Sequence, residues 1–483
     1  MTSRVRVIAI AVDAGDPQLV RALADGGELP TFRSLFASGA SGLVASSSPP
    51  VTSASVWPTF MTATGLRQHQ KYSFWAWHPD RMEVDFERFD GLRPFLRAPE
   101  MRRRSVGMLD VPYAPAPEPL NGFEIVEWGT QDFSLRSLQT WPPELVSRVR
   151  ALAGKYPIPG PLDASAWSWI PADLLDRCLE AVRRRGRLIE HLLAEASPEI
   201  FITVFPETHI ASHMLWHTAE GVDHLSAPVQ SDGPGLVDLF RELDRQIGRA
   251  LMRSGDEAAV LVFSLYGMRA GRGVPLVLDP LFRSVGLAAW VPELAFSTLR
   301  RRVPTALKRV YHRFTSPAMR LGLGKFGLIP SYDWSRTKAF PLPTDQHGLI
   351  RVNLKGREAK GIVEPSEYDR LCDKIGRLVS GLQMEDGTPV VDGVVRTSSN
   401  HQVAVSSRLP DLVIHWSPAA TREPFKLRTP AIWCELGAAR ITGEHSPHGF
   451  WVLRSPRAAG PSNGASLPSE AIGRLLIDQL ETS

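Results

Sequence analysis

The chain has 483 residues, of which 43% are hydrophobic and 22% charged, with a formal net charge of +4 at pH 7. These values are ordinary for a globular protein, and so small a charge excess over this length argues against a nucleic-acid polymer as partner. No stretch approaches the roughly 18 apolar residues that a membrane span requires. The three cysteines, Cys178, Cys372 and Cys434, are far apart and odd in number, which argues against a disulfide framework and favours a reducing, cytoplasmic compartment.

The chain opens with a β-branched, apolar run from Val5 to Val12 that predicts a buried strand ending at Asp13. A helix is expected to follow, with Asp16 as its N-cap and Pro17 as its first residue. A second helical pattern covers residues 31–37. This order of strand, loop and helix is typical of an α/β domain.

Two further apolar runs, Ile200–Phe205 and Val260–Phe263, indicate buried strands, and residues 235–251 between them carry apolar side chains at helical spacing. Near-continuous apolar strands that alternate with helices predict a large, mostly parallel central sheet with helices on both faces. We expect a single domain that spans the chain. Residues 79–195 and 285–345 are expected to be insertions or cap segments, because their composition breaks the rhythm of strand and helix.

Two early segments carry side chains suited to chemistry. Asp13 follows the first strand, at the end where α/β proteins bind ligands, although a turn or cap residue is the alternative. Residues 49–62 are rich in hydroxyl groups at an expected loop-to-helix turn. A helix N-terminus favours an anionic nucleophile there, and a capped Ser/Thr turn is the alternative.

Histidines in two later segments form a possible metal site. His209 and His213 are four residues apart, so in a helix both imidazoles lie on one face and can reach one divalent ion. Glu207 is a candidate ligand or outer acceptor. His445, in a glycine-flanked loop, can complete the three protein ligands of a catalytic zinc site. The alternative is a scaffold in which these histidines occur by chance.

Together these segments resemble the alkaline-phosphatase superfamily, in its type I phosphodiesterase and nucleotide pyrophosphatase branch. The segments that carry the resemblance are, in chain order, Ile8–Pro17, Pro49–Thr62, Phe205–Trp216, Arg351–Val363 and Gly443–Phe450. The resemblance implies an alkaline-phosphatase-like fold and a divalent metal centre, with Zn²⁺ as the first candidate and Mn²⁺ as the second. It implies that the metal-binding residues are Asp13, His209, His213 and His445. Relatives have an aspartate at the position of His209.

The resemblance also implies that the nucleophile is Ser53, which lies four residues before Trp57 and nine before Thr62. Thr52 is the alternative if the register shifts by one residue.

One segment departs from the family pattern. After the strand that ends at Phe263, relatives usually have Ser-Asp-His-Gly-Met, in which the Asp and His help to bind the metal nearest the nucleophile, whereas this chain has Leu265 and Tyr266 in those two places. Leucine cannot bind a metal, and tyrosine binds only as a phenolate, which is costly at neutral pH because its pKa is near ~10. One or two ions are therefore expected, with Tyr266 or Glu207 as possible compensation for the missing ligands.

The expected function is hydrolysis of a small-molecule phosphate ester, in particular a diester, through a covalent phospho-enzyme on Ser53 or Thr52. One alternative is a degenerate member that binds a phosphorylated or sulfated ligand without turnover. Another is a different reaction, either sulfate-ester hydrolysis or phosphoryl transfer, although the lack of a cysteine in the nucleophile segment disfavours a formylglycine sulfatase. No oligomeric state is predicted.

Overall fold

The protein is represented by a computed structural model. It describes residues 5–46, 49–129, 137–158, 172–219, 234–271, 277–291, 329–344, 346–418, 420, 426–429, 432–435, 441–456 and 461–481. The chain divides into two compact units: the first comprises Met1–His69, Arg88–Ala270 and Arg440–Ser483, and the second comprises Gln70–Glu87 and Gly271–Ala439. In the described parts, every helix is too short or too polar to span a bilayer.

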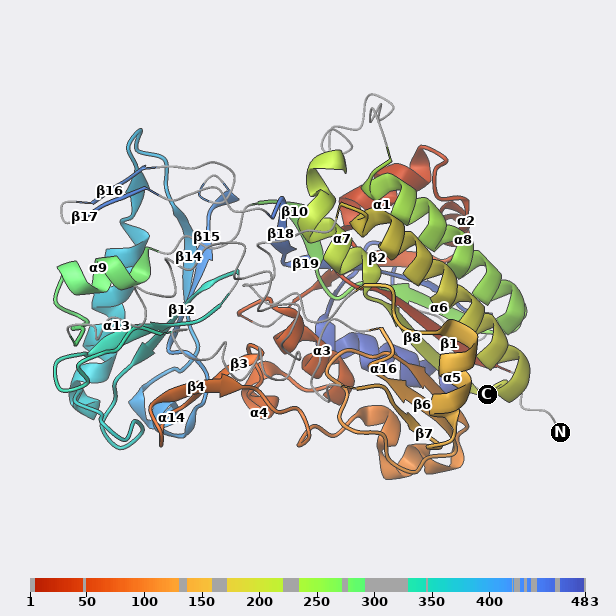
Figure 1. Cartoon of the computed structure of the whole chain (residues 1–483), viewed down its shortest axis with the longest axis horizontal. Coiled ribbons are helices and arrows are strands. Elements are labelled where there is room, and N and C mark those ends of the chain that lie inside the picture. The colour runs from red at the N-terminus through yellow and green to blue at the C-terminus, as the bar shows by residue number, and fades with distance from the viewer. Residues whose placement is uncertain are drawn as a thin grey trace. The chain divides into compact units, whose positions relative to one another are not determined.

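The first unit is built on a nine-stranded sheet in the order β20-β2-β19-β9-β1-β8-β5-β6-β7 (Figure 1). The strands are β1 (Val7–Val12), β2 (Ala40–Ala45), β5 (Val106–Leu109), β6 (Gly122–Val126), β7 (Gln139–Trp141), β8 (Ile200–Phe205), β9 (Ala259–Phe263), β19 (His448–Arg454) and β20 (Ser466–Pro468). β1 runs parallel to β8 and β9, and only β7 and β19 run antiparallel to their neighbours. Every residue of β1, β8 and β9 is buried, as their continuous apolar sequence predicts.

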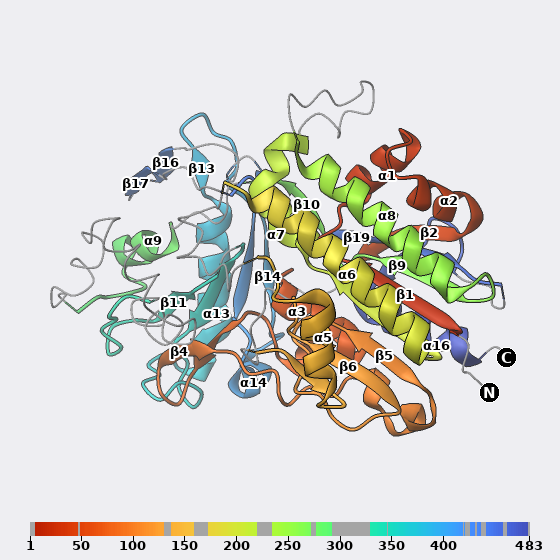
Figure 2. The same ribbon diagram turned by 45° about the vertical axis from the view of Figure 1, so that its right-hand side comes forward.

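Helices cover both faces of this sheet (Figure 2). They are α1 (Pro17–Asp25), α2 (Pro30–Ser38), α3 (Ser53–Thr62), α4 (Leu66–His69), α5 (Leu145–Ala153), α6 (Leu174–Ala196), α7 (Glu207–Leu215), α8 (Leu236–Ser254) and α16 (Ser469–Glu481), with 3₁₀ turns at Phe95–Arg97, Pro99–Arg103 and Trp216–Ala219. α6 and α8 lie side by side along one face, while α3 and α16 pack against each other and α16 contacts β1. The predicted large, mostly parallel central sheet with helices on both faces is confirmed.

The second unit contains a four-stranded antiparallel sheet in the order β11-β12-β15-β14. Its elements are β3 (Trp75–His78), β4 (Glu83–Phe86), α9 (Leu278–Ser284), β11 (Ala339–Leu342), β12 (Gly348–Val352), α13 (Pro365–Ser380), β13 (Gln383–Met384), β14 (Val391–Arg396), α14 (His401–Ser406), β15 (Leu412–Trp416), β16 (Lys426–Thr429) and β17 (Ile432–Glu435). Inside this unit, Arg351 pairs with Glu358 at 2.8 Å and Arg357 pairs with Asp411 at 2.7 Å, all four being buried or nearly so. These ion pairs give the Arg351–Val363 segment a structural part in the unit.

The two expected insertions are placed differently from the sequence interpretation. Residues 79–195 supply β5, β6 and β7 to the main sheet, as well as α5 and α6. These strands have three to five residues, too few to show a clear periodicity. The Pro-, Trp- and Arg-rich composition around them therefore led to the interpretation of an insertion. Of residues 285–345, positions 292–328 and 345 lie outside the described residues, and the rest belongs to the second unit.

The parallel strands bring three loops to one edge of the sheet. Val12 at the end of β1 pairs with Phe205 of β8, and Ala11 pairs with Phe263 of β9. The residues that follow these strands therefore meet at the edge where open α/β sheets bind ligands. Just beyond β9, β10 (Gly267–Ala270) pairs with β18 (Gly443–Ser446), which brings the distant segment with His445 to the same edge.

Candidate active site

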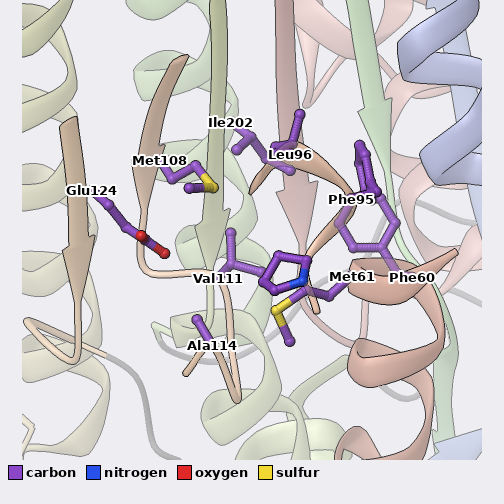
Figure 3. A pocket seen from close by; sticks show the side chains of 10 residues that line it. Phe60, Met61, Phe95, Leu96, Met108, Val111, Ala114, Glu124 and Ile202 are labelled. Atoms are coloured by element: carbon purple, nitrogen blue, oxygen red, sulfur yellow. The ribbon is translucent and has the colours of Figure 1, made fainter. Parts of the chain in front are cut away.

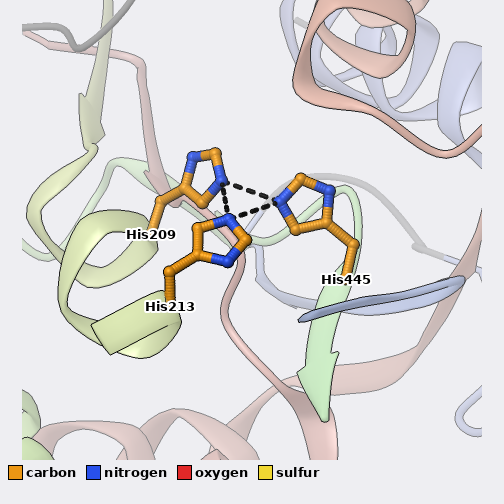
Figure 4. A group of neighbouring side chains, drawn as sticks. All are labelled: His209, His213 and His445. Atoms are coloured by element: carbon orange, nitrogen blue, oxygen red, sulfur yellow. Dashed lines mark hydrogen bonds between the residues drawn. The ribbon is translucent and has the colours of Figure 1, made fainter. Parts of the chain in front are cut away.

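Three imidazoles converge at this edge: His209 and His213 from successive turns of α7, and His445 from β18 (Figure 4). Their Nε2 atoms face one another, at 3.0 Å between His209 and His213, 2.7 Å between His209 and His445, and 3.2 Å between His213 and His445. All three side chains are buried. We call this group the histidine triad. Its three nitrogens are close enough for one ion with Zn–N distances of about 2.0–2.1 Å to contact all of them.

Each imidazole of the triad turns its other nitrogen, Nδ1, toward a hydrogen-bond acceptor. Nδ1 of His213 lies 2.8 Å from the carbonyl oxygen of Gly443, Nδ1 of His209 lies 3.1 Å from Oδ2 of Asp13, and Nδ1 of His445 lies 3.4 Å from the carbonyl oxygen of Val51. In a neutral imidazole, a proton on Nδ1 leaves a lone pair on Nε2. With this tautomer, the three Nε2 lone pairs point at one place, as in metal sites whose ligands are oriented by outer acceptors.

Protonation of His213 is an unfavourable way to relieve this repulsion. Burial and the adjacent His209 lower the pKa of His213 well below its usual value, although the bond to Gly443 opposes them. Three imidazole nitrogens that converge on one point form a donor set that fits a divalent metal such as Zn²⁺.

Position 443, two residues before His445, has no room for a side chain. A Cβ atom on Gly443 would lie 2.3 Å from the carbonyl oxygen of Ser212 in α7. Only glycine lets β18 approach α7 so closely, and this approach also brings its carbonyl oxygen within reach of His213.

Asp13 lies beside the triad and not among its converging nitrogens. Its Oδ2 faces Nδ1 of His209, while its Oδ1 accepts hydrogen bonds from Nε1 of Trp57 at 3.0 Å and from the hydroxyl of Tyr266 at 2.8 Å. Asp13 is fully buried. The structure thus gives this carboxylate three side-chain donors where the sequence predicted a metal ligand, and Tyr266 contacts it as a donor.

The hydroxyl-rich segment starts α3, as expected. Thr52 is the extended N-cap, and Ser53 is the first helical residue. The hydroxyl of Ser53 lies 2.9 Å from the hydroxyl of Tyr113, whereas the hydroxyl of Thr52 donates to its local neighbour Ser55 at 3.3 Å. Ser53 therefore meets a side chain from a distant part of the chain.

Two contacts bring the N-terminus of α3 close to the triad. Val51, just before the helix, faces His445 through its carbonyl oxygen. Trp57, one helical turn after Ser53 and on the same face, donates to Asp13. A hydroxyl group, a carboxylate and three imidazoles are thus assembled from four separate segments.

Sequence reasoning missed Tyr113. It follows β5, one of the strands hidden in the expected insertion, and its backbone has φ of 59°, a left-handed conformation that is uncommon outside glycine. Its ring packs against Phe89 with centroids 4.5 Å apart. Its position just beyond the carboxyl end of a parallel strand is the signal that could have identified it.

Glu207 is placed away from the role expected for it. It accepts hydrogen bonds from Arg185 at 3.0 Å and from Tyr156 at 3.2 Å, and Arg185 also binds Asp110 at 2.8 Å. Burial raises the pKa of Glu207, although the Arg185 charge opposes this shift. Arg185, one of three consecutive arginines in the sequence, is fully buried. Glu207 therefore anchors the first turn of α7 to α6 and does not join the triad.

A separate small hollow lies beside α3 (Figure 3). It is lined by Phe60, Met61, Pro94, Phe95, Leu96, Met108, Val111, Ala114, Glu124 and Ile202. Its one ionisable group, Glu124, is already paired with Arg97 at 2.7 Å. A volume of about 10 Å³ admits no more than one water molecule, so the hollow is too small for a substrate.

Comparisons with known proteins agree with this architecture. Residues 7–421 match the family described as type I phosphodiesterase / nucleotide pyrophosphatase. The fold is similar to that of phosphonoacetate hydrolase from Sinorhizobium meliloti 1021 in complex with phosphonoformate, with a TM-score of 0.57, 13% identity, and coverage of 99% of this chain and 96% of that chain. The same enzyme in complex with phosphonoacetate gives a TM-score of 0.53, 14% identity and the same coverage.

No curated protein matches the chain at a significant level. At 13–14% identity, the likeness to the solved structures shows a shared fold. The family match spans most of the 483 residues and includes the first strand, the α3 segment and α7. The chain therefore belongs to the type I phosphodiesterase/nucleotide pyrophosphatase family.

Proposed function

We propose that the protein is a metal-dependent hydrolase of small phosphate esters, phosphodiesters in particular, with Ser53 as nucleophile. Membership in a family of phosphoester hydrolases supports the reaction class. The observation that carries the proposal is the convergence of the three Nε2 atoms of the triad next to the helix that begins at Ser53.

In this proposal the triad holds one divalent cation. Three imidazole ligands with one position left open suit Zn²⁺, whereas Mn²⁺ prefers more oxygen ligands and is the second candidate. When bound, such a cation supplies Lewis-acid chemistry and lowers the pKa of water in the open position.

Ser53 would form the covalent intermediate. Its Oγ attacks phosphorus and a new O–P bond forms, while the bond to the leaving ester oxygen breaks; that oxygen departs with the electron pair and takes up the proton that the Ser53 hydroxyl loses. Tyr113 holds the Ser53 hydroxyl at 2.9 Å and restricts its orientation before attack. The N-terminal N–H groups of α3 favour the negative charge that develops beside them. Water then cleaves the phosphorylated serine and restores the hydroxyl.

The test compares hydrolysis of bis-p-nitrophenyl phosphate and of p-nitrophenyl phosphate by the wild type, Ser53→Ala and Thr52→Ala, each supplied with Zn²⁺ or Mn²⁺. We expect Ser53→Ala to lose on the order of 10³-fold or more in kcat, and Thr52→Ala to keep most of the activity. Mass spectrometry of the quenched reaction should find the p-nitrophenyl phosphoryl group on the peptide that contains Ser53.

Wild-type turnover no higher than that of the Ser53→Ala, Thr52→Ala double variant, for every metal and ester, would contradict the hydrolase assignment. Such a result, together with retained binding of a phosphorylated ligand, would favour the degenerate binding protein.

A further inference from the structure

The hydrogen bonds on Asp13 bear on how many ions the site can hold. Three donors reach this carboxylate from three separate elements: the indole of Trp57 in α3, the phenol of Tyr266 after β9, and the imidazole of His209 in α7. A carboxylate offers about four lone-pair positions. Three of them are used inside a side chain that has no exposed surface.

The two donors on Oδ1 are incompatible with a cation at the same atom. The indole nitrogen of Trp57 is a donor only and cannot bind a metal. The hydroxyl of Tyr266 is placed as a donor, 2.8 Å from Oδ1. Both groups therefore direct partially positive hydrogens at Oδ1, which would repel a metal ion, and their hydrogen bonds offset the buried negative charge in its place.

Among the described residues, the surroundings of Asp13 provide no alternative group of three metal ligands. Leu265 is apolar and buried next to Tyr266. Across the residues that the structure describes, the histidine triad is the one group of three or more metal-binding side chains within reach of a common ion, and Asp13 is not part of it. A second ion near the nucleophile, which the family resemblance implies, does not fit these residues.

We propose that the protein binds a single divalent cation at the histidine triad, and that Trp57 and Tyr266 form a hydrogen-bond clamp on Asp13 in the position of a second cation. Asp13 is then a positioning residue: it fixes Nδ1 of His209 and so directs Nε2 into the triad. The ring of Tyr266 also packs against His445, with centroids 4.5 Å apart, so the clamp adjoins two of the three imidazoles. Ser53 is prepared for attack by Tyr113 and by the start of α3, without an ion of its own.

This inference rests on the proposed metal centre, and the number of bound ions tests it directly. The full-length protein is stripped of metal and titrated with Zn²⁺ in competition with a chromogenic chelator, for the wild type, Asp13→Asn and Asp16→Asn. Asp16 is the matched control because it is a buried carboxylate three residues later in the chain whose side chain caps α1, and asparagine caps a helix equally well.

We expect one equivalent of Zn²⁺ per chain in all three proteins. The affinity of Asp13→Asn should fall by about 10- to 100-fold, as is typical when a ligating histidine loses its outer partner, and that of Asp16→Asn should stay unchanged. Two equivalents in the wild type, one of which is lost in Asp13→Asn, would overturn the inference and leave the hydrolase proposal intact. No bound Zn²⁺ in the wild type would overturn both.

A second measurement needs no variant and so does not depend on whether Asp13→Asn folds. The electron paramagnetic resonance spectrum of the wild type loaded with excess Mn²⁺ should show isolated protein-bound ions. A spectrum of two spin-coupled ions would show that the clamp does not exclude the second cation.

Discussion

The histidine triad and the clamp on Asp13 lie next to each other, but nitrogen atoms converge in the triad, whereas hydrogen-bond donors surround a carboxylate in the clamp. In the triad, three nitrogen lone pairs face one another within 2.7–3.2 Å. Around Asp13, three N–H or O–H groups face a carboxylate within 2.8–3.1 Å. Both groups are buried, so neither can rely on bulk water to offset its charge or its lone pairs.

The difference shows that the kind of atom that faces a buried site, donor or acceptor, determines whether the site suits a cation. The Nε2 atoms of the triad converge on one point, an arrangement that suits a cation, whereas protein donors from three elements reach the carboxylate. His209 belongs to both groups, with Nε2 in the triad and Nδ1 on Asp13. A change on either side should therefore reach the other through this one imidazole.

The largest expected effect comes from removing a member of the triad. His213→Ala leaves two imidazoles, and we expect the affinity for Zn²⁺ to fall by more than the roughly 100-fold that loss of an outer partner can cost. Turnover should fall with it. His217→Ala is the matched control, because His217 follows one turn later in the chain and is exposed. Equal metal content in the two variants, measured by inductively coupled plasma mass spectrometry, would contradict the triad as a metal site.

Sequence patterns predicted the parts of the site that depend on local order. The strand Ile200–Phe205 and the start of the first helix at Pro17 agree with the structure, because continuous apolar residues and an Asp-Pro cap act over a few positions. The i, i+4 spacing placed His209 and His213 on one face of α7. The proximity of His445 depends on the pairing of β10 with β18, and it was predicted from the need of the pair for a third ligand and from the family resemblance, not from a local pattern.

The parts that could not be predicted are pairs formed over long distances in the chain. Tyr113 meets Ser53 across 60 residues, and Trp57 meets Asp13 across 44 residues. Glu207 was expected near the metal because it follows the same strand as His209, but the buried guanidinium of Arg185 binds it instead. No local pattern distinguishes Arg185 from its two exposed or half-exposed neighbours in the arginine triplet.

The ion pair between Arg185 and Glu207 anchors α7, which carries two members of the triad. Its loss tests how much this buried network contributes to the stability of the protein. Arg185→Met leaves Asp110 and Glu207 buried without their shared counter-charge, and we expect a loss of about 3–5 kcal/mol in the free energy of unfolding. Urea denaturation provides the measurement. The control is Arg21→Met, which breaks the exposed pair with Asp25 and should change stability by no more than about 0.5 kcal/mol. Similar losses in both variants would mean that the buried network contributes no more to stability than an exposed ion pair does.

The smallest effect is expected on the hydroxyl side, at Tyr113. Tyr113→Phe removes only the hydroxyl that holds Ser53, so kcat should fall by roughly 10- to 100-fold through poorer alignment. KM and the affinity for Zn²⁺ should stay the same, because the variant keeps the three imidazoles and the acceptors that face their Nδ1 atoms. Tyr72→Phe, which removes another buried hydroxyl in the second unit, controls for general loosening of the protein. If Tyr113→Phe weakened Zn²⁺ binding as much as Asp13→Asn does, the Tyr113 hydroxyl would help to position the triad. That result would contradict the separate roles proposed for the residues around Ser53 and those around the cation.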